Sequence, residues 1–411
     1  MEKKEKAPVL RFKDTNGKDY PAWEQRKLED ICDVRDGTHS SPKYFDNGFP
    51  LVTSKNLRDG VIDLSDVQLI SKEDYLEINK RSKVDLNDIL MSMIGTIGNL
   101  ALIKEEPTFA IKNVALIKST DKVKMDYLFS YLSSPSSKCD IDKSVEGGTQ
   151  KFLSLTKVRG LKILLPGIEE QQKIGSFSVL LDGVITLHQR KLEALKKLKR
   201  TLLQKMFPKK GHLKPELRFF GFTNDWEQRK LEELASKFTG GGTPNTSNPN
   251  YWNGEIPWIQ SSDLKEDDVL SLTVKKHISQ EGLENSAAKI VPKNSLVIVT
   301  RVGVGKLVVN NQEIATSQDF LSLSGIKGDS RFLAYSLYSL LKKNSRRVQG
   351  TSIKGITKVD FLKETILIPS LEEQEKISSC MVEIDKLITL HQRKLEIYKK
   401  LKKGLLQKMF I

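Results

Sequence analysis

The sequence predicts an α+β protein made of two α/β domains and two long, near-identical helices that form an antiparallel coiled coil with pseudo-two-fold symmetry. Three observations support this fold class: the chain is a tandem repeat, each repeat ends in an apolar stripe with helical spacing, and short β-type runs fill the remainder. We expect four segments: a first domain over 1–165, a central helix over 166–210, a second domain over 211–368 and a C-terminal helix over 369–411.

The tandem repeat is visible as two segments that return 203 residues later in the chain. Residues 23–29 read Trp-Glu-Gln-Arg-Lys-Leu-Glu and return unchanged, and residues 182–207 return with 20 of 26 positions identical. The parts between them match weakly in identity but follow a shared plan. A solenoid needs several short stacked repeats, so two long copies indicate a pseudo-two-fold object built from one chain.

The end of each repeat is expected to be one long helix. No proline interrupts residues 169–207, and Pro166 stands just ahead, where the start of a helix tolerates it. At a rise of 1.5 Å per residue, ~38 residues make a rod about 55 Å long. The apolar residues of the expected seam are Ile174, Phe177, Leu181, Val184, Leu195, Leu198 and Leu202 in the first copy, and Ile377, Cys380, Ile384, Leu387, Tyr398, Leu401 and Leu405 in the second.

A helix of this length cannot bury its apolar stripe alone, so the other copy is the obvious partner. We favour an antiparallel pair, and the sequence leaves a parallel pair open. His188 and His391 fall on the seam and are expected to set its register rather than to bind metal. The repeated part of the two helices holds +11 of the formal net charge of +15. These cations either form a solvated face or contact phosphates or an acidic partner, and both interpretations stay open.

The two variable domains show the mixed pattern of α/β structure. The expected strands are 89–93, 100–104 and 110–117 in the first domain, and 295–300, 306–309 and 319–323 in the second. The expected helices are 126–132 and 331–341, and glycine-rich turns lie at 95–98 and 303–306. Residues 48–54 parallel 255–261, and 148–150 parallel 350–352, so the two domains follow one plan.

Composition narrows the class of partner. The formal net charge of +15 and a pI of about 9.4 favour a polyanion, with nucleic acid first and an anionic membrane second, against a charge that serves solubility alone. No apolar run approaches the ~20 residues that span a bilayer, and residues 1–6 lack the apolar core of a signal peptide. Cys32, Cys139 and Cys380 form no zinc or disulfide framework. We therefore expect a cytoplasmic protein with reduced thiols and no membrane contact.

Two loops, 36–44 and 241–248, are rich in small residues that form hydrogen bonds. Such side chains and nearby backbone N–H groups bind phosphates and base edges, and basic residues add charge and bidentate contacts to guanine. For any single residue the alternative is an ordinary surface role, and for Trp252 and Trp258 it is core packing. The residues expected at a DNA interface are Arg35, Thr38, His39, Lys43, Tyr44, Lys55, Arg58, Thr96, Thr149, Gln150, Thr243, Asn245, Trp252, Gln260, Ser261, Arg301, Lys306, Thr351, Ser352 and Lys354.

Catalytic motifs are incomplete in this sequence. An N6-adenine methyltransferase needs strands and helices between its glycine-rich loop and its Asn-Pro-Pro-Tyr tetrad. Here the two candidate segments, 238–242 and 248–251, are only a few residues apart in the sequence, and Asn250 stands where the tetrad needs a proline. A P-loop fails because Leu307 stands where Ser or Thr is required. The acidic–x–Lys triplet at 263–265 could serve a nuclease but is common by chance. The chain is therefore expected to bind and not to catalyse.

These features together resemble the specificity subunits of type I restriction–modification systems. Each expected helix begins with the pattern Leu-Pro-x-x-Glu-Glu-Gln, at 165–171 and, with Ile for Leu, at 368–374. The domain openings 23–28 and 226–231 also resemble the family, as does 241–258 with its Gly-Gly-Thr-Pro and Tyr-Trp-Asn-Gly-Glu-Ile-Pro-Trp motifs. The resemblance covers nearly the whole chain, except about the first ten residues.

The resemblance implies that each variable domain is a target recognition domain that reads one half of a bipartite, asymmetric site in double-stranded DNA. The helix pair then sets the gap between the half-sites, near one DNA turn. It also implies two methyltransferase (modification) subunits, which bind S-adenosylmethionine and methylate adenine N6 after flipping the base. Two motor-nuclease (restriction) subunits would use ATP and Mg, whereas this chain would hold no cofactor and no metal.

Two other functions stay open at this level. One is a DNA-binding scaffold spaced by a coiled coil and lacking enzymatic partners, which would bind its site tightly alone. The other is a self-contained DNA methyltransferase or nuclease, which would be active as the purified chain.

Overall fold

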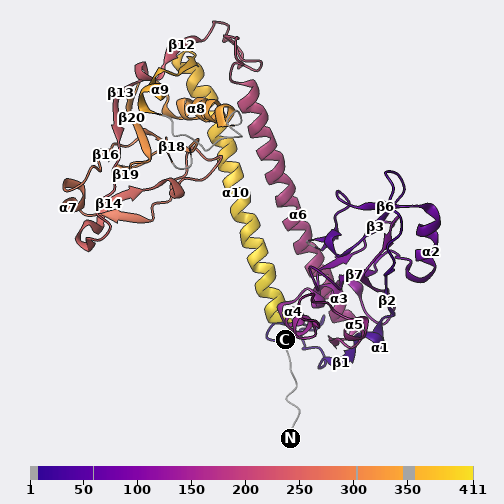
Figure 1. Cartoon of the computed structure of the whole chain (residues 1–411). Coiled ribbons are helices and arrows are strands. Elements are labelled where there is room, and N and C mark those ends of the chain that lie inside the picture. The colour runs from indigo at the N-terminus through magenta and orange to yellow at the C-terminus, as the bar shows by residue number, and fades with distance from the viewer. Residues whose placement is uncertain (1–7, 59, 302–303, 346–356, 411) are drawn as a thin grey trace. The chain divides into compact units, whose positions relative to one another are not determined.

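The computed structural model describes residues 8–58, 60–301, 304–345 and 357–410. It forms two compact units, which we call unit 1 (1–189 with 393–411) and unit 2 (190–392). The two long helices α6 (Ile168–Lys205) and α10 (Leu371–Met409) therefore each have one half in either unit (Figure 1). The units divide the chain by compactness, so the four-segment division expected from the sequence stays a prediction.

Unit 1 contains most of the elements of the first repeat. They are β1 (Glu24–Lys27), α1 (Leu28–Ile31), β2 (Val34–Asp36), β3 (Phe49–Val52), η1 (Ser54–Asn56), β4 (Leu57–Arg58), β5 (Val61–Ile62), β6 (Gln68–Ile70), α2 (Lys72–Ser82), β7 (Ile89–Ser92), β8 (Leu100–Leu102), β9 (Ala110–Ile111), β10 (Val114–Ile117), α3 (Met125–Leu132), α4 (Pro135–Lys143), α5 (Leu155–Arg159) and β11 (Lys162–Leu165).

Unit 2 follows a similar order. Its elements are β12 (Glu227–Lys230), η2 (Leu231–Glu233), β13 (Ala235–Gly240), η3 (Pro249–Tyr251), β14 (Trp252–Ile259), η4 (Ser261–Asp263), β15 (Lys276–Ile278), α7 (Gln280–Glu284), β16 (Ile290–Val291), β17 (Leu296–Val299), β18 (Leu307–Val309), β19 (Ile314–Thr316), β20 (Phe320–Ile326), α8 (Ser330–Ser345), α9 (Lys358–Lys363) and β21 (Thr365–Ile368).

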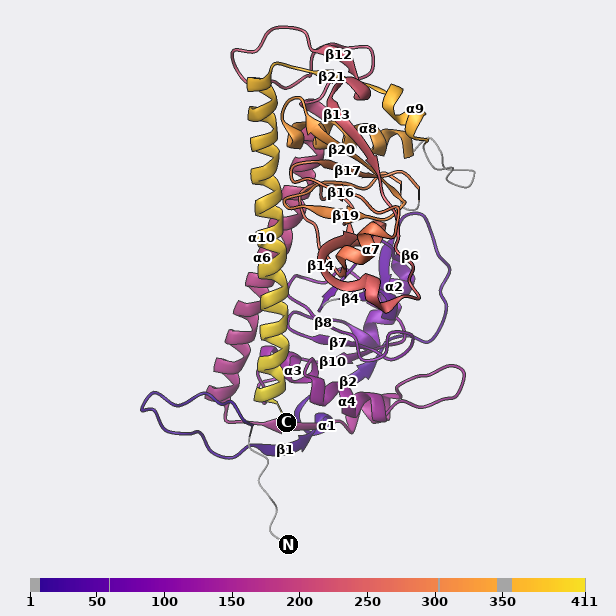
Figure 2. The same cartoon turned by 90° about the vertical axis from the view of Figure 1, so that its left-hand side faces the viewer.

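The sheets follow one plan in both units, although β16 is found only in unit 2 and the two-stranded sheet β4-β5 only in unit 1. An antiparallel sheet has the order β2-β10-β7-β8 in unit 1 and β13-β20-β17-β18 in unit 2. A second sheet has the order β6-β3-β9 in unit 1 and β15-β14-β19-β16 in unit 2, with β3 parallel to β9 and β14 parallel to β19. A two-stranded ribbon, β1-β11 or β12-β21, precedes each long helix (Figure 2). The mixed α/β plan expected for both variable domains is therefore confirmed.

One expected strand is wrong in detail. The run 110–117 is two strands, β9 and β10, that belong to different sheets. Asn113 lies between them with φ of 55°, a left-handed conformation that asparagine tolerates better than other side chains do and that interrupts a strand. The runs expected at 89–93 and 295–300 are confirmed as β7 and β17, and both strands are fully buried.

Sequence patterns did not reveal β3 and β14, although both strands lie at the centre of their sheets. Pro50 and Pro257 sit inside them, and a proline argues against a strand because it cannot donate to the ladder. These residues occupy equivalent places, opposite Leu69 and His277 in the neighbouring strands. The register therefore agrees with the alignment of 48–54 to 255–261.

The long helices pair antiparallel within each unit, as expected. In unit 1, Asp182 lies 2.5 Å from Lys402, and the His188 and Tyr398 rings stack with centroids 5.3 Å apart. The residue number therefore rises along α6 as it falls along α10. In unit 2, an ion pair 2.6 Å long joins Lys199 to Asp385, and the last turns of α6 share a core with the first turns of α10.

The expected seam is partly wrong. Leu198, Leu387 and Leu401 are exposed, whereas Leu192 and Lys199 are buried. Lys199 turns inward because it pairs with Asp385 and its amine lies 5.8 Å from the centre of the Tyr335 ring. The charged lysine thus occupies a place where the apolar pattern had suggested Leu198.

Each long helix ends inside a core. Phe410 packs against Trp23, Tyr127 and Tyr131 in unit 1. At the end of α6, Phe207 packs in the same way against Trp226 and Phe332 in unit 2. Aromatic side chains bury much apolar surface each, so these contacts tie the helix ends firmly to the domains.

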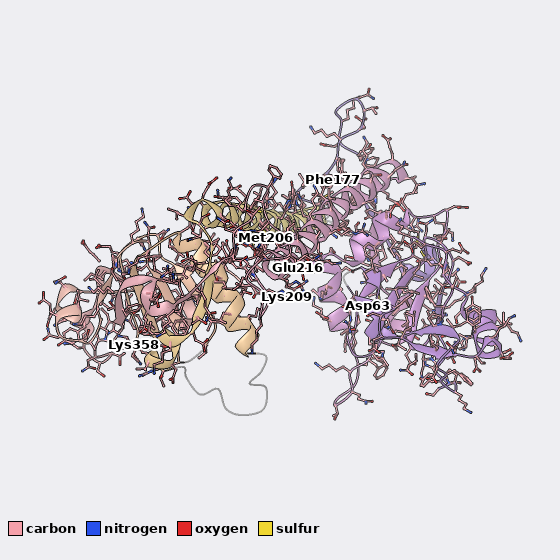
Figure 3. All side chains as sticks on the ribbon, turned by 90° about the horizontal axis from the view of Figure 1, so that it is seen from above. Asp63, Phe177, Met206, Lys209, Glu216 and Lys358 are labelled. Carbon is pink, nitrogen blue, oxygen red and sulfur yellow. The ribbon has the colours of Figure 1, made fainter. Side chains whose placement is uncertain are left out.

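A chain segment docks on the end of each long helix, and the two segments are equivalent. The backbone N–H of Leu10 donates to Lys408 O over 3.0 Å, and that of Leu217 donates to Lys205 O over 2.9 Å. The next residue in each segment, an arginine, clamps a buried glutamate: Arg11 on Glu170 and Arg218 on Glu373, both at 2.7 Å. Figure 3 labels Met206, Lys209 and Glu216 along the second segment. The N-terminal arm of unit 1 therefore repeats the linker of unit 2.

No helix among the described residues combines the length and the apolar character needed to cross a membrane. The cysteines are free: Cys32 is buried, Cys139 is exposed and Cys380 is half-buried.

Candidate nucleic-acid interface

The parallel strand pair in each unit brings several loops to one edge. Strands that run in parallel end at the same side of a sheet, so the turns after β3 and β9 meet, as do those after β14 and β19. Backbone hydrogen bonds fix these junctions: Lys112 N donates to Val52 O and Ser317 N to Ile259 O, both over 2.9 Å. The same edge therefore exists twice in the chain.

The turn after the central strand is built alike in both units. The Asn56 side chain accepts from the backbone N–H of Thr53 over 3.0 Å, and the Asp263 side chain accepts from that of Gln260 over 2.9 Å. This is a capping box, in which a short polar side chain satisfies an N–H group at the start of a helical turn. It presents Lys55 to solvent in unit 1 and Ser262 in unit 2.

We call residues 37–44, 53–56, 94–99 and 112–113 the first loop surface. The Thr96 hydroxyl donates to Ser54 O over 3.3 Å, and Lys112 Nζ donates to Ser41 Oγ over 2.6 Å. Thr38 N donates to Ile111 O over 3.0 Å, which holds the first loop against the end of β9. Most of the side chains on these loops are exposed or half-buried.

We call residues 241–248, 260–263, 300–301 and 317–319 the second loop surface. Gly242 N donates to Thr316 O over 2.9 Å, and the indole of buried Trp258 donates to Gly242 O over 3.0 Å. The Thr243 hydroxyl donates to the Gln318 side-chain oxygen. This surface carries neutral hydroxyl and amide groups where the first surface carries a histidine.

A charged cluster supports the first loop surface. One ring nitrogen of His39 lies 2.8 Å from Asp36 and the other lies 2.8 Å from Asn113 Oδ1, while Arg81 also pairs with Asp36. These two acceptors raise the pKa of His39, with Asn113 the larger cause. Burial opposes ionisation of Asp36, but His39 and Arg81 hold its pKa below the ordinary value. The imidazolium form satisfies both acceptors at once.

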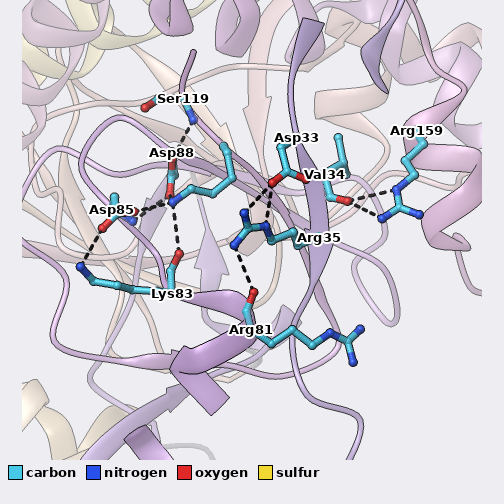
Figure 4. A network of polar contacts seen from close by, with 10 residues as sticks. Asp33, Val34, Arg35, Arg81, Lys83, Asp85, Asp88, Ser119 and Arg159 are labelled. Atoms are coloured by element: carbon cyan, nitrogen blue, oxygen red, sulfur yellow. Dashed lines mark hydrogen bonds and ion pairs between the residues drawn. The ribbon is translucent and has the colours of Figure 1, made fainter. Parts of the chain in front are cut away.

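A second polar network anchors the edge strand β2 (Figure 4). The Arg159 guanidinium donates to Val34 O over 2.7 Å, and Arg35 donates to Asp33 over 2.7 Å and to the Arg81 carbonyl over 3.3 Å. Next to it, Lys118 bridges Asp85 and buried Asp88, with both distances 2.6 Å. The network fixes the strand that carries the first loop.

The structure brings many of the expected residues together. On the two loop surfaces lie Thr38, His39, Lys43, Tyr44, Lys55, Thr96, Thr243, Asn245, Gln260, Ser261 and Arg301. The exposed loop of Thr149 and Gln150 adjoins the first surface, because Leu153 N donates to Met93 O over 2.8 Å. Thr351, Ser352 and Lys354 lie outside the described residues.

Other expected residues have local roles. Arg35 is held by Asp33, and Arg58 donates to the Lys55 carbonyl over 3.1 Å. Half-buried Trp252 packs edge-on against Trp258 and donates to Asn245 O over 3.2 Å, so it shapes the 241–248 loop. Lys306, half-buried, directly precedes β18.

Sequence reasoning missed Asn113 and Gln318 on these surfaces and Arg81 in the charged cluster that supports the first one. It singled out the loop 36–44 but did not name Asp36 as an interface residue. Arg81, Asn113 and Gln318 each meet a partner far along the chain, at separations of 45, 74 and 75 residues respectively. Only Asn113 had a local signal, because an asparagine inside an apolar run favours a break in a strand.

The motifs rejected as catalytic have structural roles. A Cβ atom on Gly241 would lie 2.2 Å from Ser317 O, and one on Gly242 would lie 2.4 Å from the carbonyl carbon of Ala287, so these glycines permit close backbone approach. Asp263 is buried as a cap. Among the described residues, no group of three or more His, Cys, Asp or Glu could hold a metal ion.

Comparisons with known proteins agree with this geometry. The model of the type I restriction modification DNA specificity domain matches the chain twice, over residues 21–197 and 223–399. The chain is 25% identical to the type I restriction enzyme MjaVIII specificity subunit of Methanocaldococcus jannaschii, over 96% of this chain and 94% of that protein.

Solved structures show the same fold. The S subunit of a type I restriction–modification system from M. genitalium superposes with a TM-score of 0.67 at 14% identity, covering 99% of both chains. A chain from a study of complex assembly in a type I restriction–modification system gives a TM-score of 0.54 at 19% identity, covering 95% of this chain and 98% of that one.

The two matches to the DNA specificity domain, one in each repeat, define a DNA-recognition protein with two such domains. The chain belongs to the family of type I restriction–modification specificity subunits. It is accordingly the non-catalytic, DNA-recognising subunit of such a system.

Proposed function

We propose that unit 1 and unit 2 each read one half of a bipartite, asymmetric site in double-stranded DNA through their loop surfaces. The observation that carries the proposal is that the same backbone register presents different side chains in the two units. His39 faces Asn113 in unit 1, whereas Thr243 faces Gln318 in unit 2. Because equivalent backbone positions carry different hydrogen-bonding groups in the two units, we expect the two half-sites to differ in base sequence.

The catalytic steps belong to partner subunits in this proposal. Two modification subunits bind S-adenosylmethionine and methylate adenine N6 in a flipped base. Two restriction subunits supply ATP- and Mg-dependent translocation and cleavage, while this chain holds no cofactor. The near-identical helices support two equivalent docking places, since 20 of the 26 repeated positions over 182–207 are identical. The assembly is expected to act on DNA in the cytoplasm.

The helix pair acts as the spacer in this proposal. The antiparallel coiled coil sets the gap between the two half-sites in the DNA, which we expect to be near one DNA turn, as for other two-headed readers. Phosphate contacts from the basic residues lower the affinity as salt rises, by roughly one power of the salt concentration for each phosphate neutralised.

Methylation mapping tests the proposal. The chain is expressed with its modification subunit, and N6-methyladenine is mapped across the host DNA. We expect one split motif with unlike halves and one methylated adenine in each half, on opposite strands. A stable complex that methylates nothing, while the chain alone binds one site tightly, indicates a scaffold instead.

A loop exchange assigns the halves. Replacing residues 241–248 should change only the half-site read by unit 2, because this loop belongs to the second loop surface. Substitution of exposed Lys293, in the turn that precedes the opposite end of β17, is the control and should leave the motif unchanged. Altered reading of both halves after the loop exchange contradicts the assignment.

A further inference from the structure

The two loop surfaces share a hydrogen-bonded pair at the same backbone positions. His39 and Thr243 each directly follow the residue whose N–H binds the end of β9 or β19, namely Thr38 on Ile111 and Gly242 on Thr316. Their partners Asn113 and Gln318 each lie two residues after those strand ends. No local pattern links either pair, since 74 and 75 residues separate the partners.

The pairs His39–Asn113 and Thr243–Gln318 engage the oxygen of each side-chain amide and leave its NH2 group available. His39 occupies the amide oxygen of Asn113, and the Thr243 hydroxyl occupies that of Gln318. Among the described residues no acceptor faces the NH2 group of either amide. Asn113 is half-buried and Gln318 is exposed. Each amide therefore offers two donors and has its oxygen engaged.

The supports differ in a way that fixes the orientation of the amide. His39 is held from its other side by Asp36 over 2.8 Å, and Arg81 holds Asp36 in turn. The ring nitrogens of His39 face Asp36 on one side and Asn113 Oδ1 on the other, so the protonated ring donates to both and holds the amide with its oxygen inward. In unit 2 the Thr243 hydroxyl donates to the Gln318 side-chain oxygen, and this contact turns the oxygen inward and the NH2 group outward.

We propose that Asn113 and Gln318 are specificity-determining residues, each donating its NH2 group to the O6/N7 edge of a guanine in one half-site. His39 and Thr243 are positioning residues that orient these amides. The proposal rests on the proposed function, in which the loop surfaces face DNA. Guanine is favoured because reading adenine requires the amide oxygen to accept from N6, and here that oxygen is turned towards His39 or Thr243. Guanine O6 and N7 need donors only, which the outward NH2 group supplies.

The two amides also differ in reach, which suits unlike half-sites. Gln318 has one more methylene than Asn113, and Asp319 stands between it and the next strand, whereas Val114 follows Asn113 directly. The guanine is therefore expected at a different place in each half-site.

Isosteric substitution is the test. The chain is expressed with its modification subunit, and the methylated motif is mapped for the wild type, for Asn113→Asp and for Gln318→Glu. Each change turns donors into acceptors, which suit cytosine N4 instead of guanine. We expect one base in one half to change, with discrimination altered about 10-fold or more and the other half untouched.

Three further variants keep the result interpretable. Asn113→Gly removes the amide without strain, because glycine adopts φ of 55° freely. It should relax that one position to any base. Thr243→Ser should preserve the motif and Thr243→Val should relax it, since only the first keeps the hydroxyl that orients Gln318.

Matched controls come from the opposite ends of the strands. Asn87 is exposed, has φ of 65° and precedes β7 at the end away from the loop surface, so Asn87→Asp carries similar backbone strain. Gln312 is exposed before β19 and controls for Gln318 through Gln312→Glu. Neither control should change the motif.

Two results overturn the inference. One is an unchanged motif at wild-type methylation levels in both Asn113→Asp and Gln318→Glu. The other is an equal loss of methylation at all sites with no change in base preference, which indicates backbone contact or folding alone. A wild-type complex that methylates no split motif fails earlier, because it overturns the proposed function itself.

Discussion

At the scale of single residues, burial and partner decide what each polar group can do. The same side-chain type behaves differently in different places: Cys32 is buried in the core of unit 1, and Cys139 is exposed on α4. His39 lies at a loop surface, where one ring nitrogen faces Asn113 and the other faces Asp36. Both partners favour the protonated ring. These differences give two predictions.

The protonation of His39 should depend on Asn113. The pKa of His39 is raised because Asn113 and Asp36 accept from its ring, so the folded state favours the protonated form. The stabilisation is fully present below the ordinary pKa of about 6.5 and is lost as pH rises through the higher folded value. An NMR titration of the His39 ring should give a midpoint above 6.5, lowered by Asn113→Gly. A wild-type midpoint at or below 6.5 contradicts this.

The cysteines should differ in reactivity towards a thiol reagent. Burial raises the pKa of Cys32 to about 12, so almost no thiolate forms at pH 8 and the reagent cannot reach it. Cys139 is exposed and should react in the fast phase. The measurement is thiol release in the native protein, with Cys139→Ser expected to remove that phase. A fast phase that persists in this variant but disappears in Cys32→Ser reverses the assignment.

At the scale of elements, two ion pairs related by the repeat cross the helix pair. Lys199 with Asp385 in unit 2 is nearly buried, with side chains 8% and 12% exposed, whereas Lys402 with Asp182 in unit 1 is 23% and 43% exposed. The buried pair is reinforced by Tyr335, whose hydroxyl donates to Asp385 over 2.7 Å. Burial raises the pKa of Asp385, and Lys199 and Tyr335 oppose that rise.

Removing the lysine from each pair should therefore have unequal effects. Lys199→Met leaves Asp385 buried without its ion partner and should lower the free energy of unfolding by about 3–5 kcal/mol. The matched variant Lys402→Met should cost about 0–1 kcal/mol, because water still solvates Asp182. Thermal unfolding followed by circular dichroism measures both. Equal shifts in Tm for the two variants would show that burial does not separate the pairs.

At the scale of the whole molecule, two equivalent chain segments bind the ends of the two long helices. The N-terminal arm meets the end of α10 in unit 1 through Leu10 and Lys408, as the linker meets the end of α6 in unit 2 through Leu217 and Lys205. Joining residue 411 directly to residue 1 puts 12 residues between Lys408 and Leu10, close to the 11 between Lys205 and Leu217.

A circular permutant should therefore fold. The permutant joins residue 411 to residue 1 and opens the chain between exposed Gly211 and His212, so that unit 2 comes first. We expect the same melting profile and the same methylated motif, since every contact of both units can form. A permutant opened between Arg190 and Lys191, in the middle of α6, is the control and should melt at a lower temperature. A permutant opened at 211 that fails to fold while the control folds contradicts the equivalence of the two segments.

The sequence by itself determined the repeat, the two long helices and the class of protein. These features are local or periodic: a 203-residue shift, an apolar stripe, and Pro and Glu at the helix starts can be recognised without knowing any distant contact. Pairing of the two helices was predictable for the same reason, because the stripe needed a partner and the other copy was available. The sequence left a parallel pair open, and the contacts of Asp182 with Lys402 and of Lys199 with Asp385 decide the antiparallel direction. The loops 36–44 and 241–248, which form part of the two loop surfaces, could also be recognised, since their hydroxyl-rich sequences are chemically unlike a core; their contact with DNA stays a prediction.

Only the tertiary structure decided which residues meet. The seam passes through Lys199 and not Leu198, because Asp385 and Tyr335 compensate a buried charge that no apolar pattern anticipates. The Asn113 and Gln318 amides gain their partners only when strands more than 70 residues apart lie side by side. Local spacing encodes periodicity and caps, whereas a hydrogen bond between distant residues depends on the path of the whole chain, which the sheets set.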